Sequence, residues 1–273
     1  MPPRDAPAGT PPRPRTARSG PVPFAVRLAV LIPVYNERDL IARAVQRLDH
    51  TPPPTLPDGT PLERRLIIVD DGSTDGTRDA LESLRGRADV IIHHHPRNAG
   101  KGAAIRTALK AALDDGADLV LVHDADLEYD PRDHPALLAP ILDDRADAVI
   151  GSRFLGSTHR VLYFWHAVAN RFITLLSNVF TNLNLTDIEC CLKAFSRPVA
   201  ERLVLRENRF GVEPEIVARL ARMRLVETHT PRRVRVFEVA VSYAGRTYAD
   251  GKKIRWTDGL SALRCILRYN ILP

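Results

Sequence analysis

Residues 119–128 read LVLVHDADLE, four apolar residues followed by a polar segment with three carboxylates. A short apolar run of this kind is typical of a strand buried inside a sheet. Alternate residues of an extended segment point to the same side, so Asp124 and Asp126 present their carboxylates together. Two close carboxylates repel each other unless a cation lies between them, and Mg²⁺ or Mn²⁺ supplies that charge. The segment favours a metal site at a strand end, although an exposed turn is the alternative.

Short apolar runs alternate with helical patterns through residues 27–151. Strands are predicted at 27–34, 66–70, 90–93, 119–123 and 148–151, and helices at 39–48, 77–85, 101–113 and 134–143. This alternation predicts an α/β fold whose mostly parallel sheet is covered by helices on both faces. Ligands of such sheets bind at the carboxyl ends of the strands, where the polar motifs of this chain fall.

The rest of the chain is less regular. Further predictions are one or two helices over 161–183, strands at 192–195 and 234–241, and helices at 212–223 and 259–271. The last helix is amphipathic, and it can either pack on the core or lie on a membrane surface. We expect a disordered Pro/Arg-rich tail at 1–22, a main domain at 23–245 and a basic C-terminal segment at 246–273.

The charge distribution narrows the possible partners. The formal net charge is +6 at pH 7, and residues 246–273 hold six Lys or Arg against two Asp. A basic segment of this kind indicates an anionic ligand or an anionic membrane surface. No aromatic-plus-basic pattern supports nucleic acid as a partner, and no run of about 18 apolar residues predicts a membrane span. Three cysteines without a disulfide framework suit a reducing cytoplasm.

Two further polar loops follow predicted strands. Asp70 and Asp71 belong to VDDGSTDGT at 69–77, where they can accept hydrogen bonds from a ribose or a base, or simply cap the next helix. Lys101 belongs to NAGKG at 98–102, which joins a strand to a helix start that favours an anion. The P-loop and dinucleotide-binding patterns are both incomplete, which argues against an ATPase or a dehydrogenase.

In their order along the chain, these motifs resemble those of family 2 glycosyltransferases, most closely the dolichol- and polyprenyl-phosphate sugar synthases. The resemblance also includes IPVYNE at 32–37, DADLEYDP at 124–131, GSRF at 151–154, TDIEC at 186–190, KAF at 193–195 and YAGR at 243–246. It covers about residues 28–270 and implies a GT-A type, Rossmann-like fold. In that fold a mostly parallel sheet is flanked by helices and followed by a C-terminal extension on the acceptor side.

The resemblance also implies roles for individual residues. The nucleotide pocket would be lined by Pro33, Tyr35, Glu37, Asp70, Asp71 and Lys101. The metal ligands would be Asp124, Asp126 and Glu128. The acceptor phosphate would be held by Arg153, with Arg246, Lys252 and Lys253 as further candidates. Asp187 falls where related enzymes have been suggested to place an acid/base carboxylate, and a structural role is an equal alternative.

The expected reaction is an inverting transfer of a hexose from GDP-mannose or UDP-glucose to a polyprenyl or dolichyl phosphate. One alternative is transfer to a sugar hydroxyl in cell-wall or polysaccharide assembly, with Asp187 or Glu189 as the base. The other is a non-catalytic nucleotide-sugar-binding protein. Many relatives carry C-terminal transmembrane helices, which this sequence does not predict. We therefore expect peripheral contact with an anionic membrane or a membrane-anchor protein, at the cytoplasmic face of the membrane.

Overall fold

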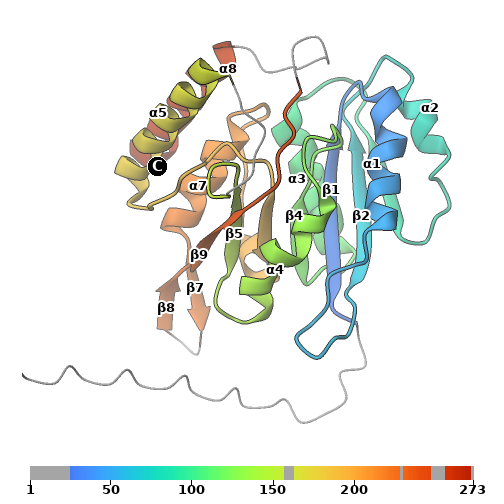
Figure 1. Ribbon diagram of the computed structural model, residues 1–273, viewed down its shortest axis with the longest axis horizontal. Helices are drawn as coiled ribbons and strands as arrows, with labels where there is room; N and C mark the ends of the chain where they lie inside the picture. Colours follow the sequence, from blue (N-terminus) through green and yellow to red (C-terminus); the bar gives the residue numbers. More distant parts are fainter. Residues whose placement is uncertain (1–24, 157–162, 228–229, 247–255, 272–273) are drawn as a thin grey trace, which may run out of the picture.

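The computed structural model describes residues 25–156, 163–227, 230–246 and 256–271. The expected tail at 1–22 and the candidates Lys252 and Lys253 lie outside these ranges. A seven-stranded sheet forms the centre of the described chain, with helices on both of its faces (Figure 1). The predicted α/β class with a mostly parallel sheet is confirmed.

The strands of the sheet are β1 (Arg27–Val34), β2 (Glu63–Asp70), β3 (Val90–His94), β4 (Leu119–Val122), β5 (Ala148–Ser152), β6 (Lys193–Ser196) and β9 (Val236–Ala240). Their spatial order is β3-β2-β1-β4-β6-β5-β9. A separate antiparallel pair consists of β7 (Arg224–Glu227) and β8 (Thr230–Arg233). The helices are α1 (Arg38–His50), α2 (Thr77–Glu82), α3 (Lys101–Asp114), α4 (His134–Leu142), α5 (Phe164–Thr181), α6 (Arg197–Arg202), α7 (Val212–Arg222) and α8 (Trp256–Ile271). The sequence prediction missed α6 and the β7–β8 pair.

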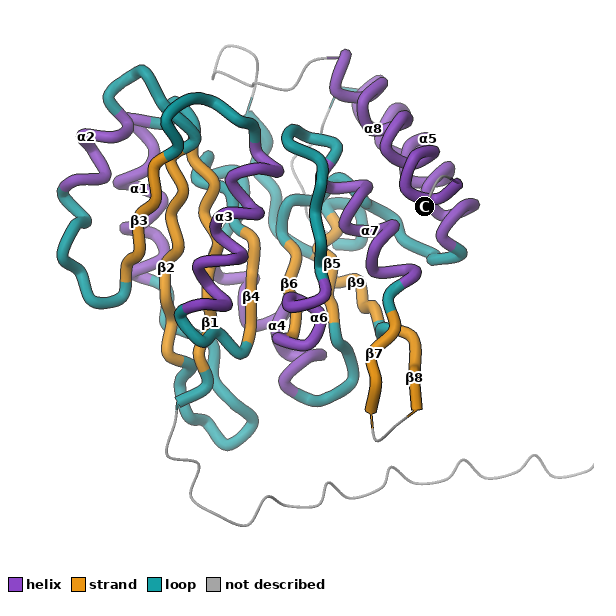
Figure 2. Tube along the Cα trace, turned by 180° about the vertical axis from the view of Figure 1, so that it is seen from behind, coloured by secondary structure: helices purple, strands orange, loops and turns teal. Residues whose placement is uncertain are grey.

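Strand β1 shows why a continuous apolar run becomes the centre of this sheet. Leu28, Val30 and Ile32 belong to the core beneath α1, α2 and α4. Ala29 and Leu31 belong to the core on the opposite face, beneath α3 and α7, which Figure 2 shows from behind. Successive side chains of a strand point to opposite faces, so a strand covered on both sides needs an apolar residue at every position.

Strand β6 runs antiparallel to both of its neighbours, β4 and β5. Its first residue, Lys193, therefore pairs with Val122 near the end of β4 and with Ile150 near the end of β5. As a result, the segment that precedes β6 reaches the same edge of the sheet as the loops that follow the parallel strands. Residues from two distant parts of the chain meet at this edge.

Helix α8 packs against α5 and α7, and the two views show α5 and α8 side by side (Figures 1 and 2). Ala262, Cys265, Ile266 and Tyr269 of α8 are buried in these contacts. Of the two alternatives for this segment, packing on the core is therefore observed. The domain boundary expected at residue 246 stays a prediction. None of the described helices is both long and apolar enough to span a bilayer.

The start of α3 is locked against the loop that precedes α7. A Cβ built on Gly102 would lie 2.2 Å from the carbonyl oxygen of Glu207, and Ala103 N donates to the carbonyl oxygen of Asn208 at 3.1 Å. Only glycine permits so close an approach of two backbones. This contact fixes the position of Lys101, one residue before Gly102.

We expect Gly102→Ala to destabilise the protein by about 1–3 kcal/mol, because the added methyl group must push two backbone segments apart. Gly259→Ala in α8 is the matched control, since its Cβ would meet nothing closer than Ile173 Cδ1 at 4.0 Å. Alanine is the better helix former, so the control should be neutral or stabilised by up to about 1 kcal/mol. Urea denaturation of both variants measures the difference, and equal stabilisation of the two would contradict the close contact.

Candidate active site

A cavity of about 730 Å³ opens at the edge of the sheet where β1, β2, β4 and β5 end and β6 begins. The predicted residues that line it are Pro33, Tyr35, Glu37, Asp71, Lys101, Asp124, Asp126, Glu128, Arg153 and Arg246. Asp70 and Asp187 are buried beside it and do not line it. Ten of the site residues that were predicted from the sequence therefore lie together around one cavity.

The β1 and β2 side of the cavity is built around Asp71. Its carboxylate accepts hydrogen bonds from Ala99 N at 2.9 Å, from Gly100 N at 2.6 Å and from the Nδ1 position of His95 at 2.7 Å. Asp70 lies behind it and accepts from Ser73 N at 3.0 Å. Asp71 thus holds the loop after β2 against the loop before α3, and Asp70 fixes the turn of the loop after β2.

The middle of the cavity holds a group of carboxylates with basic partners. Lys101 Nζ lies 2.8 Å from Asp124 Oδ2, and Arg246 Nη2 lies 3.4 Å from Asp126 Oδ2. Burial raises the pKa of Asp124, but the positive charge of Lys101 and the hydrogen bonds from Cys191 and Lys101 together outweigh this effect and leave the pKa lowered. Burial and the negative charges of Asp124 and Glu128 raise the pKa of Asp126 to about 7. The site is therefore short of positive charge at Asp126.

Two features of this group fit a divalent cation. Asp124 Oδ1 is buried without a hydrogen-bond partner, and the carboxylate of Asp126 carries the repulsion that a cation would relieve. The oxygens of Glu128 are both engaged, because Oε2 accepts from Tyr243 Oη and Oε1 from Arg246 N, each at 2.7 Å. Within the described ranges, no three His, Cys, Asp or Glu side chains form a complete cage. Asp124 and Asp126 are thus an open pair, which leaves coordination positions for a ligand.

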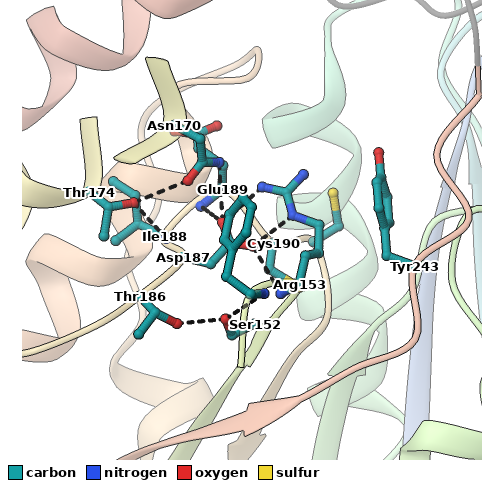
Figure 3. Close-up of polar contacts among 12 residues, drawn as sticks. Ser152, Arg153, Asn170, Thr174, Thr186, Asp187, Ile188, Glu189, Cys190 and Tyr243 are labelled. Atoms are coloured by element: carbon teal, nitrogen blue, oxygen red, sulfur yellow. Dashed lines mark hydrogen bonds and ion pairs between the residues drawn. The ribbon is translucent and has the colours of Figure 1, made fainter. Parts of the chain in front are cut away.

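Arg153 and Asp187 form a buried ion pair beside this group (Figure 3). Arg153 donates from Nε to Asp187 Oδ2 at 2.6 Å and from Nη2 to Oδ1 at 2.8 Å. Asp187 is fully buried, and it also accepts from Glu189 N and Asn170 Nδ2. Arg153 itself lines the cavity, with its Cζ 5.2 Å from the ring centre of Tyr243. Asp187 therefore orients Arg153, and Arg153 faces the cavity.

Several cavity residues were not among the predicted site residues. They include Asn98, Tyr129, Cys191, Arg209, Phe210, Glu213 and Tyr243, whereas Glu189 is predicted only as a base of the hydroxyl-acceptor alternative. One sequence signal could have found Glu213, since VEPEIV at 212–217 places two carboxylates among apolar residues in the first turn of a helix. A second signal is Lys193, a charged residue in an apolar strand. In the structure its side chain is fully buried and forms an ion pair with Glu213.

Comparisons with known proteins agree with this geometry. A family model described as "Glycosyl transferase family 2" matches residues 29–204. The undecaprenyl-phosphate 4-deoxy-4-formamido-L-arabinose transferase of Proteus mirabilis is 29% identical over 83% of this chain and 62% of that protein. The polyprenol monophosphomannose synthase of Mycolicibacterium smegmatis is 32% identical over 66% of this chain and 65% of that protein. The chain thus spans less than two thirds of the length of these two relatives.

One further relative and one solved structure are also similar to this chain. The UDP-N-acetylglucosamine–dolichyl-phosphate N-acetylglucosaminyltransferase of Methanococcus voltae is 28% identical over 72% of this chain and 82% of that protein. Glucosyl-3-phosphoglycerate synthase from Mycobacterium tuberculosis, solved with Mn²⁺, UDP and glucosyl-3-phosphoglycerate, superposes with a TM-score of 0.63. The match covers 90% of this chain and 81% of that one at 18% identity. This likeness confirms the predicted GT-A type fold.

The electrostatics of the cavity can be measured at Glu189. Burial and the nearby charge of Glu213 raise the pKa of Glu189 from 4.5 to about 7. Between these values the folded protein binds more protons than the unfolded chain, so the stability that this group contributes is lost as the pH rises through about 7. Removing the group with Glu189→Gln should therefore help the protein more at high pH than at low pH.

We expect the unfolding free energy of wild type, relative to Glu189→Gln, to fall by roughly 1–3 kcal/mol between about pH 4 and about pH 8. Urea denaturation at several pH values measures this difference. Glu201→Gln, which removes one carboxylate from the surface ion pair with Arg197, is the control. If the difference in unfolding free energy between wild type and Glu189→Gln does not change with pH, the pKa of Glu189 is not raised in the folded protein.

Proposed function

The chain belongs to glycosyl transferase family 2, and we propose that it is an inverting glycosyltransferase that moves a hexose from a nucleotide sugar to a polyprenyl or dolichyl phosphate. The observation that carries this proposal is the position of Arg153 beside the open carboxylate pair Asp124 and Asp126 in one cavity. Arg153 is suited to bind an anionic acceptor, and the carboxylate pair is suited to bind a metal ion with the diphosphate of a donor. The printed names of the three relatives support a polyprenyl- or dolichyl-phosphate acceptor.

The donor would bind across the ends of β1, β2 and β4. Pro33, Tyr35, Glu37 and Asp71 supply the wall for a nucleoside, and Asp124 and Asp126 would hold Mg²⁺ or Mn²⁺. When bound, the ion would neutralise the charge of the departing nucleoside diphosphate. Mn²⁺ together with UDP in a structural neighbour supports this assignment. Glu128 is the less suitable ligand, since Tyr243 and Arg246 already bond its oxygens.

The acceptor would bind on the Arg153 side of the cavity. A phosphate monoester with a second pKa of about 6 is largely ionised at neutral pH, so it attacks the anomeric carbon without a protein base. What the reaction needs is a cation that holds this anion close to an anionic donor, and Arg153 meets that need. Asp187 then acts as a positioning residue for Arg153. Transfer to a sugar hydroxyl would require a free base. The oxygens of Asp187 are already occupied, which leaves Glu189 as the base of that alternative.

We further propose that α5 and α8 contact the membrane that contains a lipid acceptor. The exposed apolar side chains of α5 are spaced by three and four residues, at Trp165, Val168, Phe172, Leu175 and Val179, so they form one stripe. The buried side of the same helix combines Ile173 with three polar residues, Thr174, Ser177 and Thr181. An exposed face that is more apolar than the buried face indicates a partner. On neighbouring α8, Leu260 and Leu267 are exposed together with Arg264 and Arg268, which suits an anionic bilayer.

The reaction itself is tested with a panel of donors. UDP-glucose and GDP-mannose are incubated with a short polyprenyl phosphate and Mn²⁺ or Mg²⁺, and the released nucleoside diphosphate is measured. We expect turnover with one donor, and a loss of more than about a hundredfold in Asp126→Asn because an amide cannot replace an anionic ligand. Asp143→Asn, on an exposed ion pair, is the control. No turnover with the lipid phosphate refutes the proposal, and wild-type turnover of Asp126→Asn in EDTA refutes the metal assignment.

Arg153→Ala separates the acceptor from the donor. A charge-assisted hydrogen bond to an anion contributes about 1.5–3 kcal/mol, so the use of lipid phosphate should fall roughly ten- to hundredfold. Donor affinity, measured by calorimetry, should change much less. Arg132→Ala, whose side chain is 80% exposed, serves as the control. An equal loss of donor affinity would move Arg153 to the nucleotide side.

Membrane contact is tested by co-sedimentation with vesicles. Wild type should bind anionic vesicles at low salt and be released at high salt, because each Lys or Arg near the surface contributes about 1 kcal/mol that salt screens. Trp165→Ser with Phe172→Ser should reduce binding, whereas Val226→Ser, an exposed apolar residue of β7, should not. Absence of wild-type binding to anionic vesicles at low salt would leave a membrane-anchor protein as the partner of this face.

A further inference from the structure

The wall of the cavity opposite Asp71 carries two carboxylates that the proposed reaction has not used. Glu213 is 3% exposed and lines the cavity from the first turn of α7, and Glu189 lines it from the segment before β6. Glu189 Oε1 is buried without a hydrogen-bond partner, whereas Glu213 Oε1 has Lys101 Nζ at 3.1 Å. Buried polar atoms of native proteins are almost always bonded, so the unbonded oxygen of Glu189 in the cavity points to a ligand that bonds it.

Both carboxylates are held in place from behind. Lys193 is fully buried and donates to Glu213 Oε2 and to the carbonyl oxygens of Ile188 and Cys190. Lys101 Nζ lies 3.1 Å from Glu213 Oε1, on the side of the diphosphate site. The backbone N–H of Glu189 donates to Asp187 Oδ1 at 3.2 Å, which ties this segment to the Arg153 pair. The wall is thus held from behind. Glu189 Oε1 is left for a ligand in the cavity, and Glu213 Oε1, which already faces Lys101, can accept one further hydrogen bond.

The position of this wall follows from the order of the strands. Nucleoside-binding residues follow β1 and β2, the diphosphate site follows β4, and the next strand across the sheet is β6. Glu189 lies four residues before the first residue of β6, and Arg153 directly follows β5, the strand beyond. A donor that lies along this edge therefore places the group attached to its diphosphate beside Glu189 and Glu213. Phe210 of the same wall adds an aromatic face.

The two carboxylates of this wall indicate which kind of group, attached to the diphosphate, can bind beside them. The carboxylates of Glu189 and Glu213 repel the diphosphate and the acceptor phosphate. An uncharged hydroxyl group can instead donate a hydrogen bond to either carboxylate. A hexose offers several hydroxyls together with an apolar C–H face suited to an aromatic ring. We infer that Glu189 and Glu213 bind hydroxyl groups of the transferred sugar and thereby select which sugar the protein accepts. This inference rests on the proposed function, because it assumes a nucleotide-sugar donor.

Calorimetry tests the inference by separating the binding contribution of the sugar from that of the nucleoside diphosphate. The Kd values of UDP-glucose and GDP-mannose are compared with those of UDP and GDP, in the presence of Mn²⁺, for wild type, Glu213→Gln, Glu189→Leu and Glu189→Gln. For the donor that wild type binds, Glu213→Gln and Glu189→Leu should weaken the sugar nucleotide roughly tenfold or more and leave the free diphosphate unchanged. Glu189→Gln keeps an acceptor and gains a donor, so it should retain most of the affinity. Glu82→Gln, in an exposed ion pair on α2, is the control.

The outcomes separate the inference from the function. If the variants bind sugar nucleotide as wild type does, or lose sugar nucleotide and diphosphate equally, the sugar assignment is wrong while the transferase proposal stands. A wild-type protein that binds none of the four ligands overturns both. Glu213→Gln leaves Lys193 without its anionic partner, so circular dichroism checks its fold. If it fails to fold, Glu189→Leu decides the question, because it leaves the Lys193–Glu213 pair intact.

Discussion

Repulsion among buried carboxylates is the constraint on which the rest of this structure depends. Asp124, Asp126, Glu128, Glu189 and Glu213 line one cavity, and water reaches them poorly. Such a group is tolerable only where cations are placed among its members, because an unpaired buried charge is costly. Lys101, Lys193 and Arg246 supply these charges, each from a different element. The remaining deficit of positive charge, concentrated at Asp126, is the reason for proposing a further cation at this site.

The topology explains how so many charges reach one place. Parallel strands deliver the polar loops that follow them to a single edge of the sheet, and the antiparallel β6 delivers the segment that precedes it to that same edge. The close approach of α3 to the loop before α7, which Gly100 and Gly102 permit, then brings Lys101 within reach of Asp124 and Glu213. Backbone geometry thus sets the charge balance of the cavity.

The sequence predicted those parts of the site that depend on neighbours along the chain. An apolar run followed by Asp124 and Asp126 specifies a strand end with paired carboxylates, and the fold class follows from repeats of that pattern. The pairing of Lys193 with Glu213 could not be predicted, because it depends on how β6 and α7 pack together. The same holds for Asp187, whose burial beside Arg153 is a tertiary feature that no local spacing reveals. The β7–β8 pair was missed because half of its residues are charged and they show no alternation of apolar and polar positions.

The bond between Arg246 and Glu37 joins residues 209 positions apart, and Arg246 also lies against Asp126. A ribosome makes the segments after β1 and β4, which contain Glu37, Asp124 and Asp126, long before it adds Arg246. Until then, the emerging chain holds this acidic centre without one of its compensating cations. The centre therefore reaches its final charge state late in synthesis, and a growing chain that has already formed β1 to β4 still lacks the complete cavity.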